Sequence, residues 1–318
     1  MLNKMRNSLR GYPSAHAMRS RLSADEETRL SWAKSIATFE AVPALYQPFL
    51  EPFLASGYGF PYTVLTPTFE GSMRRATEKL VCVFDHEIYV LRRSGDTFEA
   101  QDFPLAEIAY VEVRIILLDS HIKISGLDRQ GVPVSTTIQF NTVTDYLFRP
   151  MLEKIRLAGV NVQEANRSSN VEQIDQWVRS NYKFEYYAKH SLLRGERLIQ
   201  AVFQPEIRES IFKALGKIYQ RTLSPTHVSI LTDREIILIR EELRQSGKDR
   251  YGGIWDYIPL RKIDQLSLQE KDGNLWVLSV QIAGGESMES LYEACMAREV
   301  HLFLEKFREL ALAPRAGA

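Results

Sequence analysis

The feature that most restricts the fold of this 318-residue chain is an internal repeat. Segment 79–93 resembles segment 227–241, and Asp85 in the first matches Asp233 in the second. Further along, the spacing between matching residues changes once, from 148 to 155 residues, and then stays constant. The later matches are Pro104-Leu105 with Pro259-Leu260, and Leu147-Phe148 with Leu302-Phe303. One loop insertion, which fits the polar stretch 242–251, explains a single change of spacing, so we predict two copies of one fold.

Short apolar runs rich in β-branched and aromatic residues predict that each copy consists mainly of strands. A hairpin is expected at 80–91 in the first copy and at 228–239 in the second. The other expected strands are 62–66, 108–112, 122–124 and 135–140 in the first copy, and 198–203, 263–267, 275–282 and 287–294 in the second. These are six of the about seven short strands that we predict for each copy.

Each copy is predicted to end in a helix. In the first, Thr142–Asp145 is a capping signal, and Pro150 is expected to kink or restart the helix. The apolar stripes are Leu147, Phe148, Met151, Leu152 and Ile155 in the first helix, and Val300, Phe303, Leu304, Phe307 and Leu310 in the second. Strands followed by one closing helix predict an α+β fold.

This pattern resembles that of bacterial pleckstrin-homology-like (PH-like) domains, here in tandem. The resemblance covers residues 61–158 and 195–311, and it rests on the strand order, the Pro-Leu-x-x-Ile strand entry and the terminal helix. It implies that each copy is a bent antiparallel seven-stranded barrel or sandwich capped by a C-terminal helix. Neither copy carries the terminal-helix tryptophan of eukaryotic members, or the Lys-x-[Lys/Arg]-x-Arg cluster of members that bind phosphoinositides.

With this interpretation the chain has five parts. They are a basic tail with a helical extension (1–60), a first PH-like domain (61–159), a linker with a helix (160–194), a second PH-like domain (195–311) and a short tail (312–318).

Both connecting parts carry local signals. A capping box at Ser23–Glu26 predicts a helix over 24–40 in the extension, and Pro43, Pro48 and Pro52 predict an irregular connector after it. A second capping box, Ser169–Glu172, predicts the linker helix.

No motif for catalysis or metal binding is found in the sequence. The six histidines have no metal-ligand spacing, and nucleophile-elbow, Walker and dinucleotide-binding motifs are absent. Asp85-His86-Glu87 lies at a predicted hairpin tip, where solvated turn residues are expected rather than a catalytic set. We therefore predict a protein that is not an enzyme and has no cofactor or metal.

Charge and cysteine content limit the partners and the compartment. The 40 Lys and Arg balance the 40 Asp and Glu, which argues against a nucleic-acid-binding chain. Two cysteines, Cys82 and Cys295, fit a reducing compartment, and the lack of an apolar run of membrane-spanning length completes the prediction of a cytoplasmic protein.

Binding surfaces are the remaining candidates. Segment 207–221 has a helical apolar spacing, so Lys213, Lys217 and Arg221 are expected on one face of a helix. The candidate anion- or lipid-binding residues are Arg74, Arg75, Lys79, Lys213, Lys217 and Arg221.

Three functions remain open from the sequence. The first is an interaction or adaptor protein that binds a protein or peptide, for instance by strand addition to an exposed sheet edge. Such an edge would also let one copy pair with the other copy or with a second chain. The second is a peripheral membrane module that binds acidic lipid head groups through the basic residues just named. The third is a hydrolase with its site between the two copies.

Overall fold

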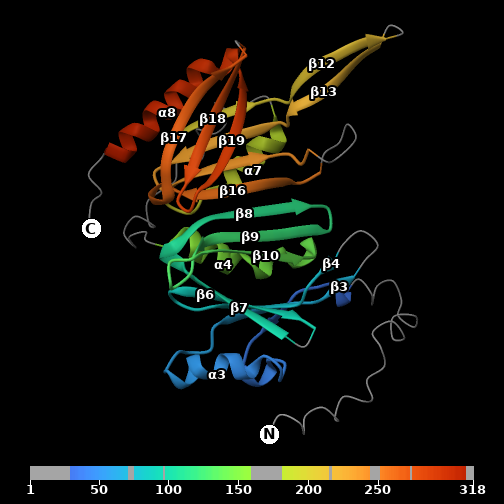
Figure 1. Cartoon of the computed structure of the whole chain (residues 1–318), viewed down its shortest axis with the longest axis vertical. Helices are drawn as coiled ribbons and strands as arrows, with labels where there is room; N and C mark the ends of the chain where they lie inside the picture. The colour runs from blue at the N-terminus through green and yellow to red at the C-terminus, as the bar shows by residue number, and fades with distance from the viewer. Residues whose placement is uncertain are drawn as a thin grey trace.

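The computed structural model describes most of the chain. The described residues are 29–70, 75–95, 97–158, 181–214, 217–243, 251–272 and 274–312. Strands dominate, and three main antiparallel sheets stack along the long axis of the molecule (Figure 1). None of the described sheets closes into a barrel, and the fold is α+β.

The first sheet has five strands in the order β1-β2-β5-β6-β7. They are β1 (Lys34–Ile36), β2 (Tyr62–Thr66), β5 (Lys79–Val83), β6 (Glu87–Ser94) and β7 (Thr97–Pro104). Helix α3 (Gln47–Ala55) covers its outer face (Figure 1), where Tyr46 and Leu50 join a cluster with Leu80 and Leu91. The predicted hairpin at 80–91 is confirmed as β5–β6.

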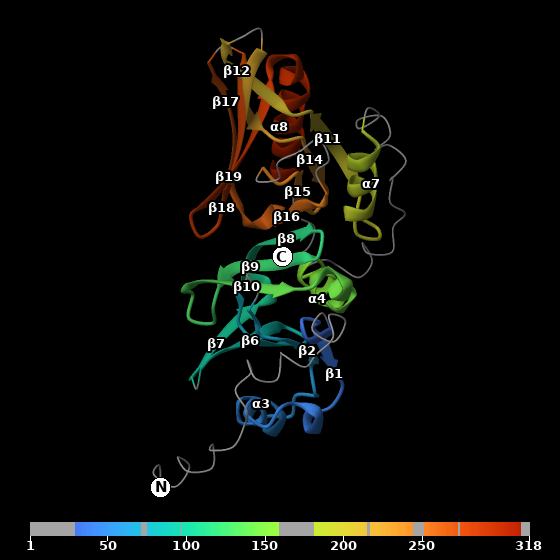
Figure 2. The same ribbon diagram turned by 90° about the vertical axis from the view of Figure 1, so that its right-hand side faces the viewer.

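The second sheet has seven strands in the order β10-β9-β8-β16-β15-β14-β11 and runs through both copies of the repeat. The first copy supplies β8 (Ile108–Ile116), β9 (Asp119–Leu127) and β10 (Pro133–Phe140); the second supplies β11 (Leu198–Gln204), β14 (His227–Thr232), β15 (Glu235–Arg240) and β16 (Gly253–Pro259). Helix α7 (Tyr182–Ser191) packs on the part from the second copy (Figure 2).

The third sheet and the closing helices complete the two copies. β17 (Ile263–Lys271), β18 (Leu275–Ile282) and β19 (Glu286–Glu293) form a three-stranded sheet against α8 (Ala297–Leu312). In the first copy, Asn141 caps a 3-10 helix over Thr142–Leu147, and α4 (Arg149–Arg156) restarts after it with Pro150 in its first turn. The restart is as predicted, because proline is tolerated where a helix begins.

The two copies have the same order of elements. In each, a first strand is followed by a two-stranded ribbon, three strands, a 3-10 turn at the Pro-Leu site, three more strands and a helix. The described non-glycine residues with positive φ are Leu117 (52°) and Asp272 (53°), which lie 155 residues apart at matching hairpin turns. The backbone therefore repeats even at a conformation that L-residues rarely adopt.

Two local predictions for the N-terminal extension were wrong. In place of a helix up to residue 40, residues 34–36 form β1, because they pair with the edge of β2. The connector expected to be irregular contains α3, whose Pro48 lies in the first turn, where its missing N–H costs nothing. The linker helix expected at Ser169 falls on residues 159–180, outside the described residues.

A third error concerns segment 207–221, which is an antiparallel ribbon and not a helix. β12 (Ile207–Ala214) pairs with β13 (Lys217–Ser224), and register shifts at Arg208 and Phe212 interrupt the two-residue alternation of a regular strand. These bulges give apolar residues a spacing that imitates a helix.

Candidate functional site

The two copies are joined by a main-chain strand pairing. β8 pairs with β16, with Val111 opposite Tyr257, Glu112 opposite Asp256, and Val113 opposite Trp255. Trp255 and Tyr257 pack against apolar clusters of both copies, so β16 covers the edge of β8 with hydrogen bonds and with side chains. Pairing of one copy with the other was one of the roles expected for an exposed edge strand, but no pattern in the sequence identified β8 and β16 as the partners.

A buried ion cluster supports one side of the junction. Arg156, from α4 of the first copy, donates to Glu235 of the second copy and lies 3.9 Å above the ring of Tyr257. It also donates to the Ser191 carbonyl at 2.6 Å and lies 3.6 Å from Glu196. Burial raises the pKa of Glu196 to about 8, so its neutral form is favoured near neutral pH.

Charged side chains cover the other side. Arg240 donates to Asp256 and, at 3.1 Å, to Glu112 from the first copy. Glu112 also lies 2.9 Å from His121. Burial raises the pKa of Asp256 to about 6, although the neighbouring Arg240 opposes this shift. Arg240 thus links Asp256 of the second copy to Glu112 of the first, while the buried Oδ1 of Asp256 has no hydrogen-bond partner within the described residues.

The counterpart of β8 in the second copy is β17, and its outer edge is open. β17 pairs with β18 on one side and is the last strand of its sheet within the described residues. α8 packs beside it and shares the cluster of Leu266 and Leu268. Asp264, Gln265 and residues 269–271 are exposed. The structure therefore has a nine-residue edge strand next to a helix.

The candidate basic residues do not form one patch. Arg74 lies outside the described residues, and Arg75 lies in β4 (Arg75–Ala76), which pairs with β3 (Phe69–Glu70). Lys79 is buried, and its Nζ donates to Thr136 at 3.2 Å and to the Thr137 carbonyl. Burial lowers the pKa of Lys79 to about 8. Lys79 is thus a core residue and not part of a solvent-facing surface.

The other candidates lie on the β12–β13 ribbon, which stands out from the body on the same side as β3–β4 (Figure 1). Lys213 pairs with Ile218 and Lys217 with Ala214 in the ladder. Arg221 forms a 2.7 Å ion pair with Glu209, and both side chains are exposed. Ile211 and Tyr219, on this ribbon, are 57% and 46% exposed.

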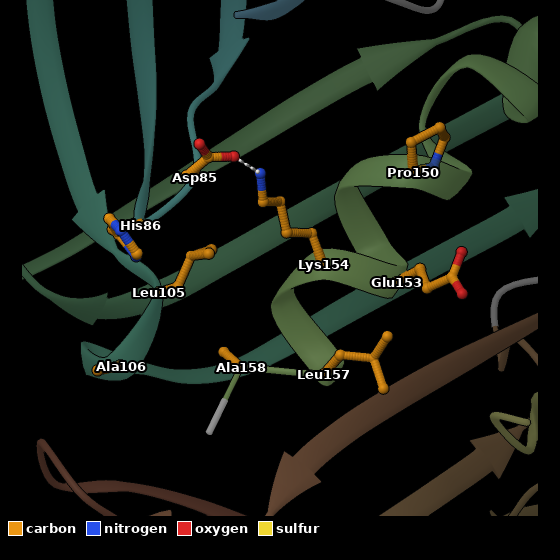
Figure 3. A pocket seen from close by; sticks show the side chains of 9 residues that line it. All are labelled: Asp85, His86, Leu105, Ala106, Pro150, Glu153, Lys154, Leu157 and Ala158. Atoms are coloured by element: carbon orange, nitrogen blue, oxygen red, sulfur yellow. Dashed lines mark hydrogen bonds and ion pairs between the residues drawn. The ribbon is translucent and has the colours of Figure 1, made fainter. Parts of the chain in front are cut away.

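A shallow pocket lies between the β5–β6 turn and α4 (Figure 3). Lys154 of α4 reaches across to Asp85 at 2.9 Å, with His86 and Leu105 beside them. The Asp85 carboxylate is paired and almost fully exposed, as expected for a turn residue. The geometry provides no nucleophile with a base here.

Comparison with known proteins finds no family model and no curated protein that matches the chain. Among the described residues, no three His, Cys, Asp or Glu side chains form a group that could hold a metal ion. No helix within that part of the chain is both long and apolar enough to cross a membrane. The geometry is therefore the basis for a functional proposal.

An exposed sheet edge was expected, but the strand that provides it, β17, was not identified, although the sequence carries a signal for it. The first five residues of β8 are Ile108-Ala109-Tyr110-Val111-Glu112, whereas β17 begins Ile263-Asp264-Gln265-Leu266-Ser267. A strand paired on both edges and buried on both faces is apolar, and an exposed edge is polar.

Proposed function

We propose that this chain is a non-enzymatic interaction protein built from two tandem PH-like units, and that its second unit binds an extended polypeptide segment along β17. The observation that carries the proposal is the junction itself. β8 accepts β16 as an added antiparallel strand, and β17, at the same place in the other copy, has no such strand among the described residues.

The open edge has the features that strand addition requires. The outward N–H and C=O groups of an edge strand can form main-chain hydrogen bonds with a peptide of any sequence. The alternate side chains of the strand provide specificity. Leu266 and Leu268 lie on one face, toward the cluster shared with α8, while Ser267 and Gln269 lie on the other. The preferred segment would have alternating apolar and polar residues, with basic residues opposite Asp264 and Glu270.

The test uses the full chain and a displayed library of random peptides. Neighbouring residues of a strand direct their N–H groups to opposite edges, so Ser267→Pro and Leu268→Pro are made separately: one of them removes an N–H group on the open edge of β17, and the other removes an N–H group on the edge paired with β18. The variant that loses the N–H group on the open edge should keep the unfolding midpoint of the parent chain. Its affinity for the selected peptides should fall at least about tenfold. Selected peptides that bind both variants as they bind the parent chain would refute this site.

A second candidate function has a specific observation in its favour. The β12–β13 ribbon exposes Ile211 and Tyr219, and its strand residues 210–214 and 217–220 include two lysines and no acidic residue. Apolar and cationic residues together favour contact with an anionic lipid surface, where each basic group contributes about 1 kcal/mol. This would make the chain a peripheral membrane module.

Co-sedimentation with phosphatidylserine-containing vesicles tests this candidate. The double variant Ile211→Ser with Tyr219→Ser should lose at least about tenfold in vesicle affinity, and binding by the parent chain should fall as salt rises. Tyr182→Ser, at another exposed aromatic residue, is the matched control. Equal binding by the double variant and the control would exclude the ribbon as the lipid contact.

A further inference from the structure

A polar pocket of about 350 Å³ lies where the two copies meet, on the face of the seven-stranded sheet opposite Tyr257. Glu112 of the first copy lines it, together with His227, Arg240 and residues 286–290 of the second. The apolar parts of its wall come from Leu238 and Met288. This pocket is separate from the β17 edge.

Among the residues that line this pocket, His227 has a buried polar atom without a hydrogen-bond partner in the described part of the chain. It is only 5% exposed, and its Nδ1 lies 3.0 Å from the Pro225 carbonyl, which can only accept a hydrogen bond. Nδ1 therefore carries the proton, and Nε2 is an acceptor. Within the described residues Nε2 is buried and has no hydrogen-bond partner. A buried acceptor without a donor is costly, and a ligand that supplies a donor would remove that cost.

The charges around the pocket restrict the ligand. Three carboxylates line it, from Glu112, Glu286 and Glu289, against the single guanidinium of Arg240. Arg240 is already bound to Asp256 and Glu112. Glu286 accepts from Tyr110 and from Ser125 at 2.9 Å, and it forms an ion pair with Lys123 at 3.3 Å. Glu289 is exposed, and no hydrogen bond or ion pair is found for it within the described part of the chain. The unused groups are thus acceptors and negative charge.

We propose that this pocket binds a small organic ammonium ion, with its N–H groups directed to His227 Nε2 and to the Glu289 carboxylate. An anion would meet excess negative charge. A metal ion would lack ligands, since no group of three suitable side chains exists among the described residues. A short aliphatic amine also suits the walls, because Met288 and Leu238 can contact its methylene groups. Burial lowers the pKa of His227 to about 4, so its ring stays neutral and can accept at neutral pH.

Calorimetric titration of the full chain with 1,4-diaminobutane tests the proposal. We expect saturable binding at millimolar or lower concentration, weaker binding of the uncharged isostere 1,4-butanediol, and none of succinate. Saturable binding of succinate, or no binding of the diamine, would overturn the proposal.

Two variants test the residues. Glu289→Gln removes the exposed charge, and His227→Asn keeps a donor for the Pro225 carbonyl but lacks Nε2. Each should weaken diamine binding at least about tenfold. Glu51→Gln, an exposed carboxylate on α3, is the matched control and should bind as the parent does. If His227→Asn does not fold, Glu289→Gln still decides, because unchanged affinity there places the amine elsewhere.

Discussion

β8 and β17 occupy the same place in the two copies, yet they have different surroundings. β8 is paired on both edges, and six of its nine residues are buried, whereas β17 is paired on one edge and only Leu266 is buried. Their hairpin turns are alike, with a positive φ at Leu117 and at Asp272. The two strands therefore share one backbone path, and their side chains differ because, within the described residues, only β8 has a neighbouring strand on its outer edge.

Amide hydrogen exchange should show the largest difference between the two strands. Nearly all amides of β8 have partners and should exchange only on global unfolding, whereas the outward amides of β17 face solvent. We expect the outward amides of β17 to exchange at least about 10³-fold faster than those of β8, as measured by NMR. Equal protection would mean that something already covers β17.

Breaking the ion cluster beneath the junction should have the largest effect on stability. Arg156→Ala leaves the buried carboxylate of Glu235 without its cation, and we expect a loss of about 3–5 kcal/mol in the free energy of unfolding. Urea denaturation measures it. Arg149→Ala, on the same helix with an exposed side chain, should cost under about 1 kcal/mol. Similar losses in the two variants would contradict a role of the cluster in joining the copies.

Two buried bases occupy matching positions and should give stability two separate pH dependences. Lys79 begins β5 and His227 begins β14, 148 residues apart, and burial lowers both pKa values, to about 8 and about 4. Because each unfolded base binds a proton more readily than the folded one, each contributes stability that rises with pH. The windows are about 4 to 6.5 for His227 and about 8 to 10.5 for Lys79.

The measurement is the difference in unfolding free energy between parent and variant as pH changes. Between about pH 4 and 6.5, the unfolding free energy of the parent should rise relative to that of His227→Asn by up to about 1.4 kcal/mol per pH unit. Between about pH 8 and 10.5, it should rise by a similar amount relative to that of Lys79→Met. Buried Glu196 makes stability fall as pH rises, because burial raises its pKa. This contribution is the same in the parent and in both variants, so it cancels in the difference. A flat difference would show that the base is not buried in solution.

The smallest effect is expected at the two matching turns. Leu117→Gly should stabilise the chain by about 0.5–1 kcal/mol, because glycine adopts a positive φ without a steric penalty. Asp272→Leu should destabilise it by a similar amount, since aspartate tolerates this conformation better than leucine. The midpoint temperatures of thermal unfolding of the two variants and the parent measure both effects. A loss of stability in Leu117→Gly would show that the exposed leucine has a contact of its own.

The sequence predicted what depends on local order and missed what depends on distant pairing. Both hairpins, the strand entry after Pro-Leu and the restart at Pro150 follow from local patterns and were confirmed. The pairing of β8 with β16 joins edges far apart along the chain, and no periodicity encodes it. The ribbon at 207–224 was missed because its bulges place isoleucines at helical spacing. The Nε2 of His227 could not be predicted, since its isolation results from three-dimensional packing.

The shared sheet has a consequence for biosynthesis. The ribosome completes β8 long before it reaches β16, so the nascent first copy emerges with an apolar edge strand that stays uncovered until about half of the second copy has been made. A chain that ends between the two copies would expose the edge of β8 and would be prone to pair with other truncated chains through it. The first copy therefore depends on the second during biosynthesis as well as in the finished fold, because β16 is what covers its exposed strand edge.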